Sequence, residues 1–536
     1  MAKSKKRSTN VKSAVRKDPV KSSSARTNSG VRRDKLARED RMVETNNGSR
    51  TPKQVAVDEA VASNKNAAAV LAAEPKVEDE EQLAVTTANG FEVIGIERVP
   101  ENARQHTKLL DTMWLWWTAD TVIATVALGT LSFYYGLGFW GSAAVILVFN
   151  LLAALVIGFL STWGPKTGLA QMALGRFAFG YWGAKLPALF NALSCVGWTA
   201  VNSALGASLL TAWSGGKIPA WVGVIIIVVL TCVVSLFGYF IVHSYSRIAW
   251  IPIAIVFAII CVMDAQHFNI NVPVTVSGGA LVSSVLTFGG AVFGYAIGWA
   301  SYAADYTRHQ PVTVSRSKVF WYSFLGILVA NVVLEILGVL LITPLKGNTL
   351  PDAGSLVTSI VGNGALGSII ILLLGLSIIS NNAPTDYSFA LSSQVVGARV
   401  PRWVLTIIGM ILYTAVGIFV STNLNFNLEG FLLMMAYWLG AFSAIVIIEH
   451  ILRKGQYNVE DYLTPGKLPL GAAAVIALIV ALVIAALGIN QASVIGYEGP
   501  LSHMLSDADI GFPLAVVAAV VIYTPLRLWE RQRTGR

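Results

Sequence analysis

Trp198 and Asn202 are four residues apart in the apolar segment ALFNALSCVGWTAVNSALGASLL. In a helix this spacing puts both side chains on one face. An indole plane beside an amide suits a flat polar heterocycle, which needs stacking on its face and hydrogen bonds at its edge. Alternatively, Trp198 fills the core and Asn202 makes a hydrogen bond between helices. Both interpretations remain open on the residues alone.

Three other apolar segments carry groups that hydrocarbon does not tolerate unpaired. The segment MWLWWTADTVIATVALGTL is interrupted at Thr118 and Asp120, and LTFGGAVFGYAIGWASYAADYTR is loosened by glycines, with Trp299 directly after Gly298. The third has the polar stretch SNNAPTD at residues 380–386. Glycine and proline weaken a helix, and polar backbone survives in a membrane only where it faces a cavity or another helix. These interruptions predict a polar site inside a bundle.

Carboxylates in such segments predict coupling chemistry. Asp120 and Asp386 lie in two of the interrupted segments, where an intramembrane carboxylate is a functional hypothesis by default. Burial favours the protonated form, so we expect both to take part in proton coupling or in contact with the substrate. Asp305 precedes Arg308 at a helix end and is a candidate for a gate ion pair, or simply for an interfacial pair.

Composition places most of the chain in a membrane. Of the 536 residues, 54% are hydrophobic and 13% charged, and the mean hydropathy is +0.62. A spanning helix needs about 20 mostly apolar residues, which predicts an all-α integral membrane protein with twelve spans. The twelve predicted spans are residues 112–136, 139–162, 184–212, 219–241, 247–266, 282–304, 319–343, 364–393, 402–422, 429–451, 469–489 and 511–528.

The ends of the chain differ from this membrane part. Residues 1–90 are predicted to be a disordered cytoplasmic arm, basic in its first half and rich in Ser, Asn and Thr. It serves either as a solvated tail or as an attachment to anionic lipid headgroups. The transporter domain is predicted at residues 91–530 and a short basic tail at 531–536.

The positive charges orient the spans. Of the eighteen Lys and Arg residues after residue 110, sixteen fall on one set of connections, and the opposite set holds Lys217 and Lys346. Because cytoplasmic loops carry the excess of Lys and Arg, we expect both termini to be cytoplasmic.

The interrupted spans recur at a fixed interval. The first and the sixth span begin two successive groups of five, and both are interrupted. Interrupted helices at corresponding positions of two halves indicate an inverted-repeat transporter with its site near the membrane midplane. Two C-terminal helices would follow the repeats.

Several long motifs, in order, carry a family resemblance. They are GIERVPENAR, MWLWWTADTVIATVALG, SCVGWTAVNS, FGYAIGWASYAADYTR and SNNAPTDYSFALSSQ. Over about residues 90–530 the chain resembles the nucleobase:cation symporter-1 family, in particular its purine–cytosine permease branch. The resemblance implies a twelve-helix protein of the 5+5 inverted-repeat (leucine-transporter-like) fold. It also implies import of cytosine, purines or related heterocycles across the plasma membrane, coupled to protons or sodium.

The resemblance also implies roles for particular residues. Trp198 and Trp299 would sandwich the base, with Asn202 at its edge. Thr118 and the interrupted first helix would line the same cavity. The eighth span would complete it with Asn381, Asn382, Pro384 and Thr385.

The chain departs from the pattern of its relatives in ways that bear on the coupling ion. Related permeases often have Asn where this chain has Asp120, and commonly Asn where it has Thr385 or Asp386. The Ser/Thr pair that sodium-coupled members use is only partly matched by Ser377 and Ser380, which are weak sodium candidates. We therefore expect the proton as the coupling ion, with sodium as the alternative, and no other cofactor or metal.

Other functions fit the sequence less well. The six histidines are dispersed and the three cysteines lack metal-ligand spacing, which argues against a membrane enzyme. No repeated filter element indicates a channel, and no aromatic pattern accompanies the basic arm to indicate nucleic-acid binding. A transporter of the same fold for allantoin- or hydantoin-like compounds, or for amino acids, is the alternative. The sequence does not assign the preferred base, the oligomeric state, or roles for Glu335 and Glu429.

Overall fold

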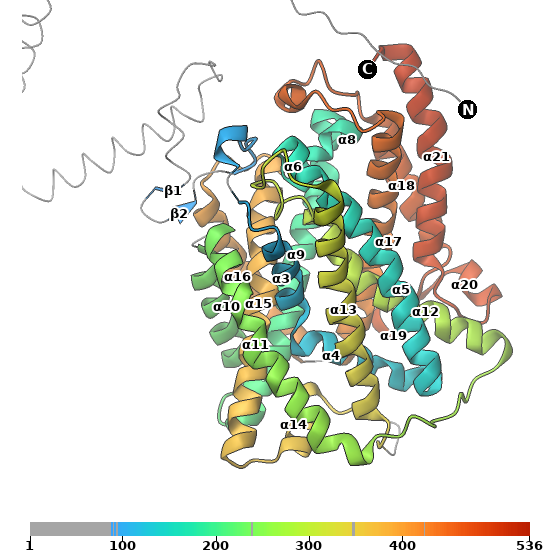
Figure 1. Ribbon diagram of the computed structural model, residues 1–536. Helices are drawn as coiled ribbons and strands as arrows, with labels where there is room; N and C mark the ends of the chain where they lie inside the picture. Colours follow the sequence, from blue (N-terminus) through green and yellow to red (C-terminus); the bar gives the residue numbers. More distant parts are fainter. Residues whose placement is uncertain are drawn as a thin grey trace, which may run out of the picture. The chain divides into compact units, whose positions relative to one another are not determined.

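The computed structural model of the chain is mostly helical (Figure 1). It describes residues 87–88, 91–92, 95–104, 106–236, 239–345, 349–422 and 424–536. The predicted arm at 1–90 lies almost wholly outside these residues. The described strands form two short antiparallel pairs, β1 (Thr87–Ala88) with β2 (Phe91–Glu92) and β3 (Asn490–Gln491) with β4 (Tyr497–Glu498).

In the described part of the chain, nine helical segments are long and apolar enough to cross a membrane, judged by length and composition. They contain α5 (Gly138–Ser161), α9 (Lys185–Trp213), α11 (Tyr239–Asp264), α12 (Gly278–Ile297), α13 (Arg316–Ile342), α15 (Ala365–Val396), α16 (Arg402–Val420), α17 (Leu424–Leu452) and α21 (Gly511–Thr534). The three other predicted spans carry shorter apolar helices. These are α4 (Ile123–Thr130) with η3 (Leu131–Tyr134), α10 (Ala220–Leu236) and α18 (Ala472–Ala486).

Short helices occupy connections where the sequence predicted none. Between α5 and α9 lie α6 (Trp163–Thr167), α7 (Gln171–Leu174) and α8 (Arg176–Gly183), and α14 (Ala353–Val361) lies between α13 and α15. The remaining short elements are η2 (Glu101–Ala103), η4 (Ala265–His267), η6 (Val459–Leu463), α19 (Ala492–Ile495) and α20 (Pro500–Met504). Helix α21 continues to Thr534, so most of the predicted tail is helical.

Two of the predicted interruptions are present. The first span consists of α3 (Leu110–Asp120) and α4, separated by Thr121 and Val122, and Val122 has extended backbone angles (φ −141°, ψ 161°). The sixth span changes from the α-helix α12 to the 3₁₀ helix η5 (Gly298–Tyr302). Both changes leave backbone groups without α-helical partners in the middle of the bundle.

The third predicted interruption is wrong, because α15 continues as one helix through the polar stretch and through Pro384. Proline weakens a helix by removing the hydrogen bond to the carbonyl four residues earlier, and membrane helices tolerate it where neighbouring helices pack against them. Around this stretch Tyr306 donates from its hydroxyl to the Pro384 carbonyl at 2.5 Å, and Asn202 of α9 donates to the side-chain oxygens of Asn381 and Asn382. Asp386 therefore lies on a continuous helix.

The packing of the ten helices from α3/α4 to α17 repeats after five helices. The pair α3–α11 in the first half corresponds to α12–α17 in the second, and α4–α13 corresponds to α5–α12. In the same way α9–α16 corresponds to α10–α15. The pairs α9–α15, α5–α13 and α10–α16 each join a helix of the first half to its own counterpart in the second half. Because five is odd, a second group of five starts on the opposite side of the membrane, so this two-fold pattern is that of an inverted repeat. Helices α18 and α21 follow and pack on α17.

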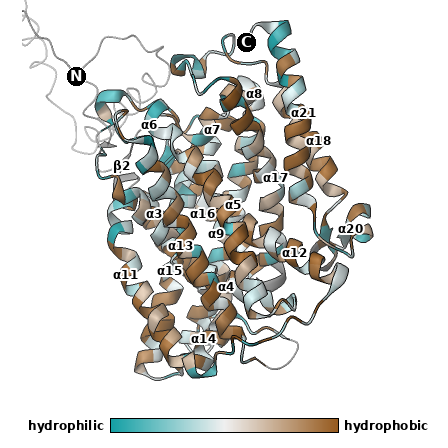
Figure 2. Cartoon of the chain, turned by 45° about the vertical axis from the view of Figure 1, so that its right-hand side comes forward, coloured by the Kyte–Doolittle hydropathy of each residue, from teal (hydrophilic) through white to brown (hydrophobic). Residues whose placement is uncertain are grey.

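Apolar side chains remain exposed along the spans, as a lipid-facing surface requires. Examples are Val262 of α11, Ile411 and Phe419 of α16, and Val521 of α21. Figure 2 shows hydrophobic residues along α5, α13 and α18, with hydrophilic residues at the C-terminal end of α21. The chain is a multi-pass membrane protein.

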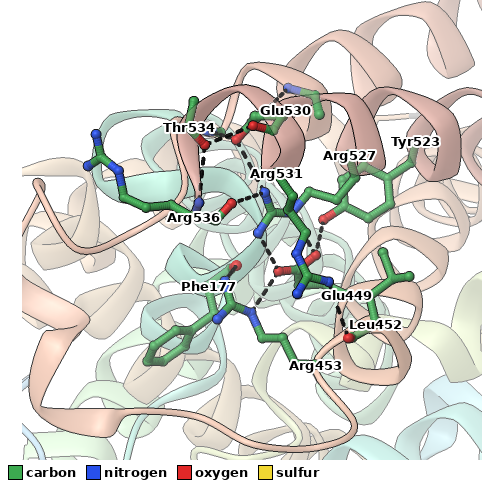
Figure 3. Close-up of polar contacts among 12 residues, drawn as sticks. Phe177, Glu449, Leu452, Arg453, Tyr523, Arg527, Glu530, Arg531, Thr534 and Arg536 are labelled. Atoms are coloured by element: carbon green, nitrogen blue, oxygen red, sulfur yellow. Dashed lines mark hydrogen bonds and ion pairs between the residues drawn. The ribbon is translucent and has the colours of Figure 1, made fainter.

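A buried charge cluster holds α21 against α17 (Figure 3). Glu449 of α17 accepts hydrogen bonds from Arg527 at 2.9 Å on each oxygen, from Arg453 at 2.6 Å and from the Tyr523 hydroxyl at 2.8 Å. Arg527 and Glu449 are 1% and 2% exposed. Each charge is thus compensated, whereas losing one partner would leave the other buried alone.

We expect Arg527→Leu to destabilise the protein by roughly 3 kcal/mol, the lower end of the range for breaking a buried ion pair, because Arg453 remains. The measurement is thermal unfolding of the purified protein in detergent. Arg533→Leu is the matched control, because Arg533 is exposed on the same helix. Equal midpoints for the two variants would contradict the role of the cluster.

Candidate functional site

Aromatic residues of α9 and the sixth span, together with Asn381 of α15, enclose a small cavity. Trp198 of α9, Tyr295 and Gly298 of the sixth span, Trp299, Tyr302 and Asn381 line it. These side chains nearly fill the space between them, since the cavity volume is about 10 Å³, which is about what one water molecule needs. The structure therefore brings Trp198, Trp299 and Asn381, three of the predicted site residues, to one closed space.

Trp198 lies against the backbone where α12 changes into η5. A Cβ atom at Gly298 would be 2.9 Å from Cζ2 of the Trp198 ring, so only glycine allows this approach. Tyr295 and Phe431 contact the ring edge to face, with centroids 5.4 and 4.9 Å away. Within the described residues the buried Trp198 Nε1–H has no hydrogen-bond partner, which leaves a donor beside the cavity.

Asp120 positions Trp299. It is the last residue of α3, is fully buried, and accepts a hydrogen bond on Oδ1 from Trp299 Nε1 at 2.9 Å. Trp116 and Tyr302 contact the Trp299 ring edge to face at 5.4 and 5.5 Å. The other oxygen of Asp120, Oδ2, has no partner within the described residues. The carboxyl at the helix break thus fixes an aromatic wall and keeps one oxygen available.

Asparagines join α9, α15 and the break in the first span. Asn202 Nδ2 donates to Oδ1 of Asn381 at 2.7 Å and of Asn382 at 3.0 Å. Asn381 Nδ2 donates to the Ala119 carbonyl at 2.7 Å, and Asn382 Nδ2 to Ser203 Oγ at 3.3 Å. The polar stretch of α15 therefore faces other helices rather than lipid, and of its two amides only Asn381 also lines the cavity.

Other predicted site residues do not line this cavity. Thr118 donates to the Ser246 carbonyl of α11 at 2.5 Å, and Thr385 donates to the Asn381 carbonyl one turn back at 3.1 Å. Pro384 offers only its carbonyl, to Tyr306. Asp386 accepts from the Tyr413 hydroxyl of α16 at 3.0 Å and so lies on another side of α15.

Ser377 and Ser380, the weak sodium candidates, lie near the break but are hydrogen-bonded. Ser377 Oγ donates to the Leu374 carbonyl at 2.6 Å and accepts from the first N–H of α4, that of Ile123, at 3.4 Å. Ser380 Oγ is 3.1 Å from the Tyr245 hydroxyl of α11.

Asp305, the gate candidate, binds the short helix α7 and α15. Its Oδ1 accepts from the Gln171 backbone N–H at 2.7 Å and its Oδ2 from Ser388 Oγ at 2.9 Å. Arg308 donates to the Gly95 carbonyl and to the Tyr387 hydroxyl, at 2.7 and 2.8 Å. Together they fasten the turn after η5 to the segment before α3 and to α15.

An ion pair that the sequence did not single out ties α3 to α11. Arg247 donates from two nitrogens to Asp111, with Nε at 2.7 Å from Oδ1, and His106 Nε2 is 2.9 Å from Asp111 Oδ2. Burial lowers the pKa of His106 despite this carboxylate, and burial beside Arg308 holds the pKa of His309 well below its usual range. Neutral imidazoles leave Arg247 as the cation that pairs with Asp111.

Tyr295 and Tyr302 are the cavity residues that sequence reasoning missed. They precede and follow Trp299 by four and three residues in FGYAIGWASY. Both spacings put side chains near one helical face, so this periodicity could have found them.

Comparisons with known proteins place the chain among permeases. A family model described as a permease for cytosine/purines, uracil, thiamine and allantoin matches residues 98–508. The purine-cytosine permease fcyB of Emericella nidulans is 36% identical over 459 residues, covering 82% of this chain and 89% of that protein. The purine-cytosine permease FCY2 of Saccharomyces cerevisiae is 33% identical over 465 residues, covering 83% and 87%.

The fold also matches a solved structure. Mhp1, a nucleobase-cation-symport-1 family transporter, was solved in a closed conformation with bromovinylhydantoin bound. It aligns with a TM-score of 0.63 at 16% identity, covering 81% of this chain and 96% of that one. At this identity the likeness concerns the fold alone, and it confirms the predicted leucine-transporter-like architecture.

We expect Gly298→Ala to displace the Trp198 ring and to lower stability by about 1–3 kcal/mol, because overfilling a packed site costs this much. Thermal unfolding and the tryptophan emission spectrum measure the two effects. Gly364→Ala is the control, since a Cβ there meets nothing within 4 Å. An unchanged spectrum and midpoint for Gly298→Ala would contradict the close contact.

Proposed function

Because the chain belongs to the family of permeases for cytosine/purines, uracil, thiamine and allantoin, we propose that it imports cytosine or purines across the plasma membrane by proton symport. Its curated relatives are permeases and not enzymes. The observation that carries the proposal is the closed cavity with Trp198 and Trp299 in its wall. Transport would follow alternating access around this site, between the two repeats.

The chemistry of the cavity fits a nucleobase. Indole and phenol rings supply faces for stacking on a flat ring, and each stacked base is worth about 1–3 kcal/mol. The unpartnered Trp198 Nε1–H and the Asn381 side chain offer polar contacts at the edge. Asn202 would act indirectly, because its 2.7 Å hydrogen bond holds the side chain of Asn381 in place. Thr118, Pro384 and Thr385 would contribute by shaping the helices around the site.

The coupling ion is proposed to be the proton. Asp120 has an unpartnered carboxyl oxygen, and its other oxygen accepts the hydrogen bond from Trp299. A change in the protonation of Asp120 would therefore change the strength of this hydrogen bond to the cavity wall. Asp386 is a second candidate, on the side of α15 that faces α16. The sodium alternative would require Ser377 and Ser380 to exchange their present hydrogen bonds for an ion. Asp305 is proposed to help close the site by fastening the turn after η5.

The alternative substrate class is a hydantoin- or allantoin-like compound. Mhp1 was solved with bromovinylhydantoin bound, and the family description includes allantoin. An amino acid is less suited to a cavity walled by four aromatic rings. The excess of Lys and Arg on one set of connections supports cytoplasmic termini.

The proposal is tested by uptake of labelled cytosine into cells that express the chain, with and without a protonophore and with sodium replaced. We expect saturable uptake that the protonophore abolishes and sodium replacement leaves intact. Excess adenine, hypoxanthine or allantoin in the same assay ranks the substrates. Absence of base uptake by well-expressed protein would refute the substrate, and dependence on sodium would refute the coupling ion.

Trp198→Ala should weaken cytosine binding by roughly 5- to 150-fold, which corresponds to the loss of about 1–3 kcal/mol of stacking. The measurement is the inhibition constant of unlabelled cytosine in the uptake assay. Trp140→Ala is the matched control, because Trp140 is 67% exposed on α5. Equal affinities for the two variants would remove Trp198 from the site.

A further inference from the structure

Glu335 is a carboxyl group in the last third of a spanning helix. It belongs to α13 and is fully buried. Its Oε2 accepts a hydrogen bond from Asn150 Nδ2 of α5 at 2.8 Å. Its Oε1 is buried and, in the described part of the chain, has no hydrogen-bond partner. The carboxyl is therefore half satisfied.

The groups around Glu335 are amides rather than cations. Asn150 Oδ1 accepts from Asn331 Nδ2 at 3.0 Å, and Asn331 Oδ1 is a second buried acceptor without a partner among the described residues. The titratable groups close to Glu335 are Asp120 from the end of α3 and Tyr295 from α12. The packed helices α4 and α5 contain no Asp, Glu, His, Lys or Arg. No salt bridge to Glu335 is present in the described structure.

This setting favours the neutral acid. An ionised carboxylate without a cation in a water-free interior costs many kcal/mol, and a single amide donor does not compensate it. Glu449 shows the contrast, since three cationic or hydroxyl side chains surround it. A proton on Glu335 removes the charge, and the unpartnered Oε1 is the atom that can carry it.

Glu335 is also connected to the cavity. Helix α4 packs on α13 so closely that a Cβ at Gly129 would overlap the Glu335 carbonyl. Thr125 of the same helix α4 is hydrogen-bonded at 2.7 Å to the hydroxyl of Tyr295, which lines the cavity. A change in how α4, α5 and α13 pack would thus move both the groups around the Glu335 carboxyl and the Tyr295 side chain in the cavity wall.

We propose that Glu335 is a proton-binding site of the transport cycle, an inference that rests on the proposed proton symport. The site takes up its proton from water when the α5–α13 interface is hydrated. It releases it by breaking the carboxyl O–H bond, with the proton passing to water and the negative charge staying on the carboxylate. Because the packed arrangement, with one amide donor and no cation on Glu335, favours the neutral acid, closing the bundle around Asn150 and Asn331 is linked to carrying the proton.

The test uses the full chain in proteoliposomes, with labelled cytosine. Two activities are compared for each variant: accumulation driven by an inward proton gradient, and exchange of cytosine without any gradient. Glu335→Gln keeps the amide contact but holds no titratable proton, so it should keep exchange and lose gradient-driven accumulation. Glu335→Asp keeps a carboxyl and should retain some gradient-driven accumulation. Glu429→Gln is the matched control, since Glu429 is another carboxyl with a hydroxyl partner, Tyr135, at 2.5 Å, and should behave as wild type.

Gradient-driven accumulation by Glu335→Gln equal to wild type would overturn the inference. So would loss of exchange in both Glu335 variants, because the residue would then be needed for folding or movement rather than for the proton. If Glu335→Gln loses exchange, retained accumulation by Glu335→Asp still supports the inference. Failure of the proposed function is distinguishable, because the wild-type protein itself would then show no cytosine exchange or no response to the proton gradient.

Discussion

The break between α3 and α4 is the constraint on which the middle of the bundle depends. At Thr121 and Val122 the backbone leaves the helix in the buried interior of the bundle, so other helices supply partners for it. Asn381 of α15 donates to the Ala119 carbonyl, and Ser377 accepts from the first N–H of α4. The side chain at the break, Asp120, accepts from Trp299. The same contacts that satisfy the backbone also build the cavity.

The two-fold packing pattern explains why the break, the cavity and the polar part of α15 coincide. The interrupted helices begin the two repeats, and α9 and α15, which correspond to each other, pack along each other. Asn202 on α9 and Asn381 on α15 join this pair through a 2.7 Å hydrogen bond. The polar stretch lies on a continuous α15 and bonds to α9 and to the end of α3.

Buried carboxyls in this bundle are compensated in two different ways. Glu449 is surrounded by Arg527, Arg453 and Tyr523, an arrangement that compensates a charge and joins α17 to α21. Glu335 accepts a hydrogen bond from Asn150, and Asp120 accepts one from the Trp299 indole. In each carboxyl the other oxygen has no hydrogen-bond partner among the described residues. The first kind favours a permanent structural charge, and the second favours a group whose charge changes.

The sequence alone determined the class of protein and the approximate places of the spans, because apolar length and charge asymmetry are local properties of the chain. The resemblance carried by its motifs implied that Trp198 and Trp299 share a site, and the structure places both in the wall of one cavity. The sequence also indicated the interruptions at Asp120 and Gly298, where residue types weaken a helix. It predicted a third interruption around Pro384 that does not exist, since α15 is continuous there and tolerance of a proline depends on packing by helices that are distant in sequence. Only the tertiary structure decided that Asp386 faces Tyr413 of α16, that Tyr295 and Tyr302 line the cavity, and that Glu335 has an amide and no cation bonded to it in the described part of the chain. Those facts follow from which helix faces meet, and neither composition nor spacing fixes that.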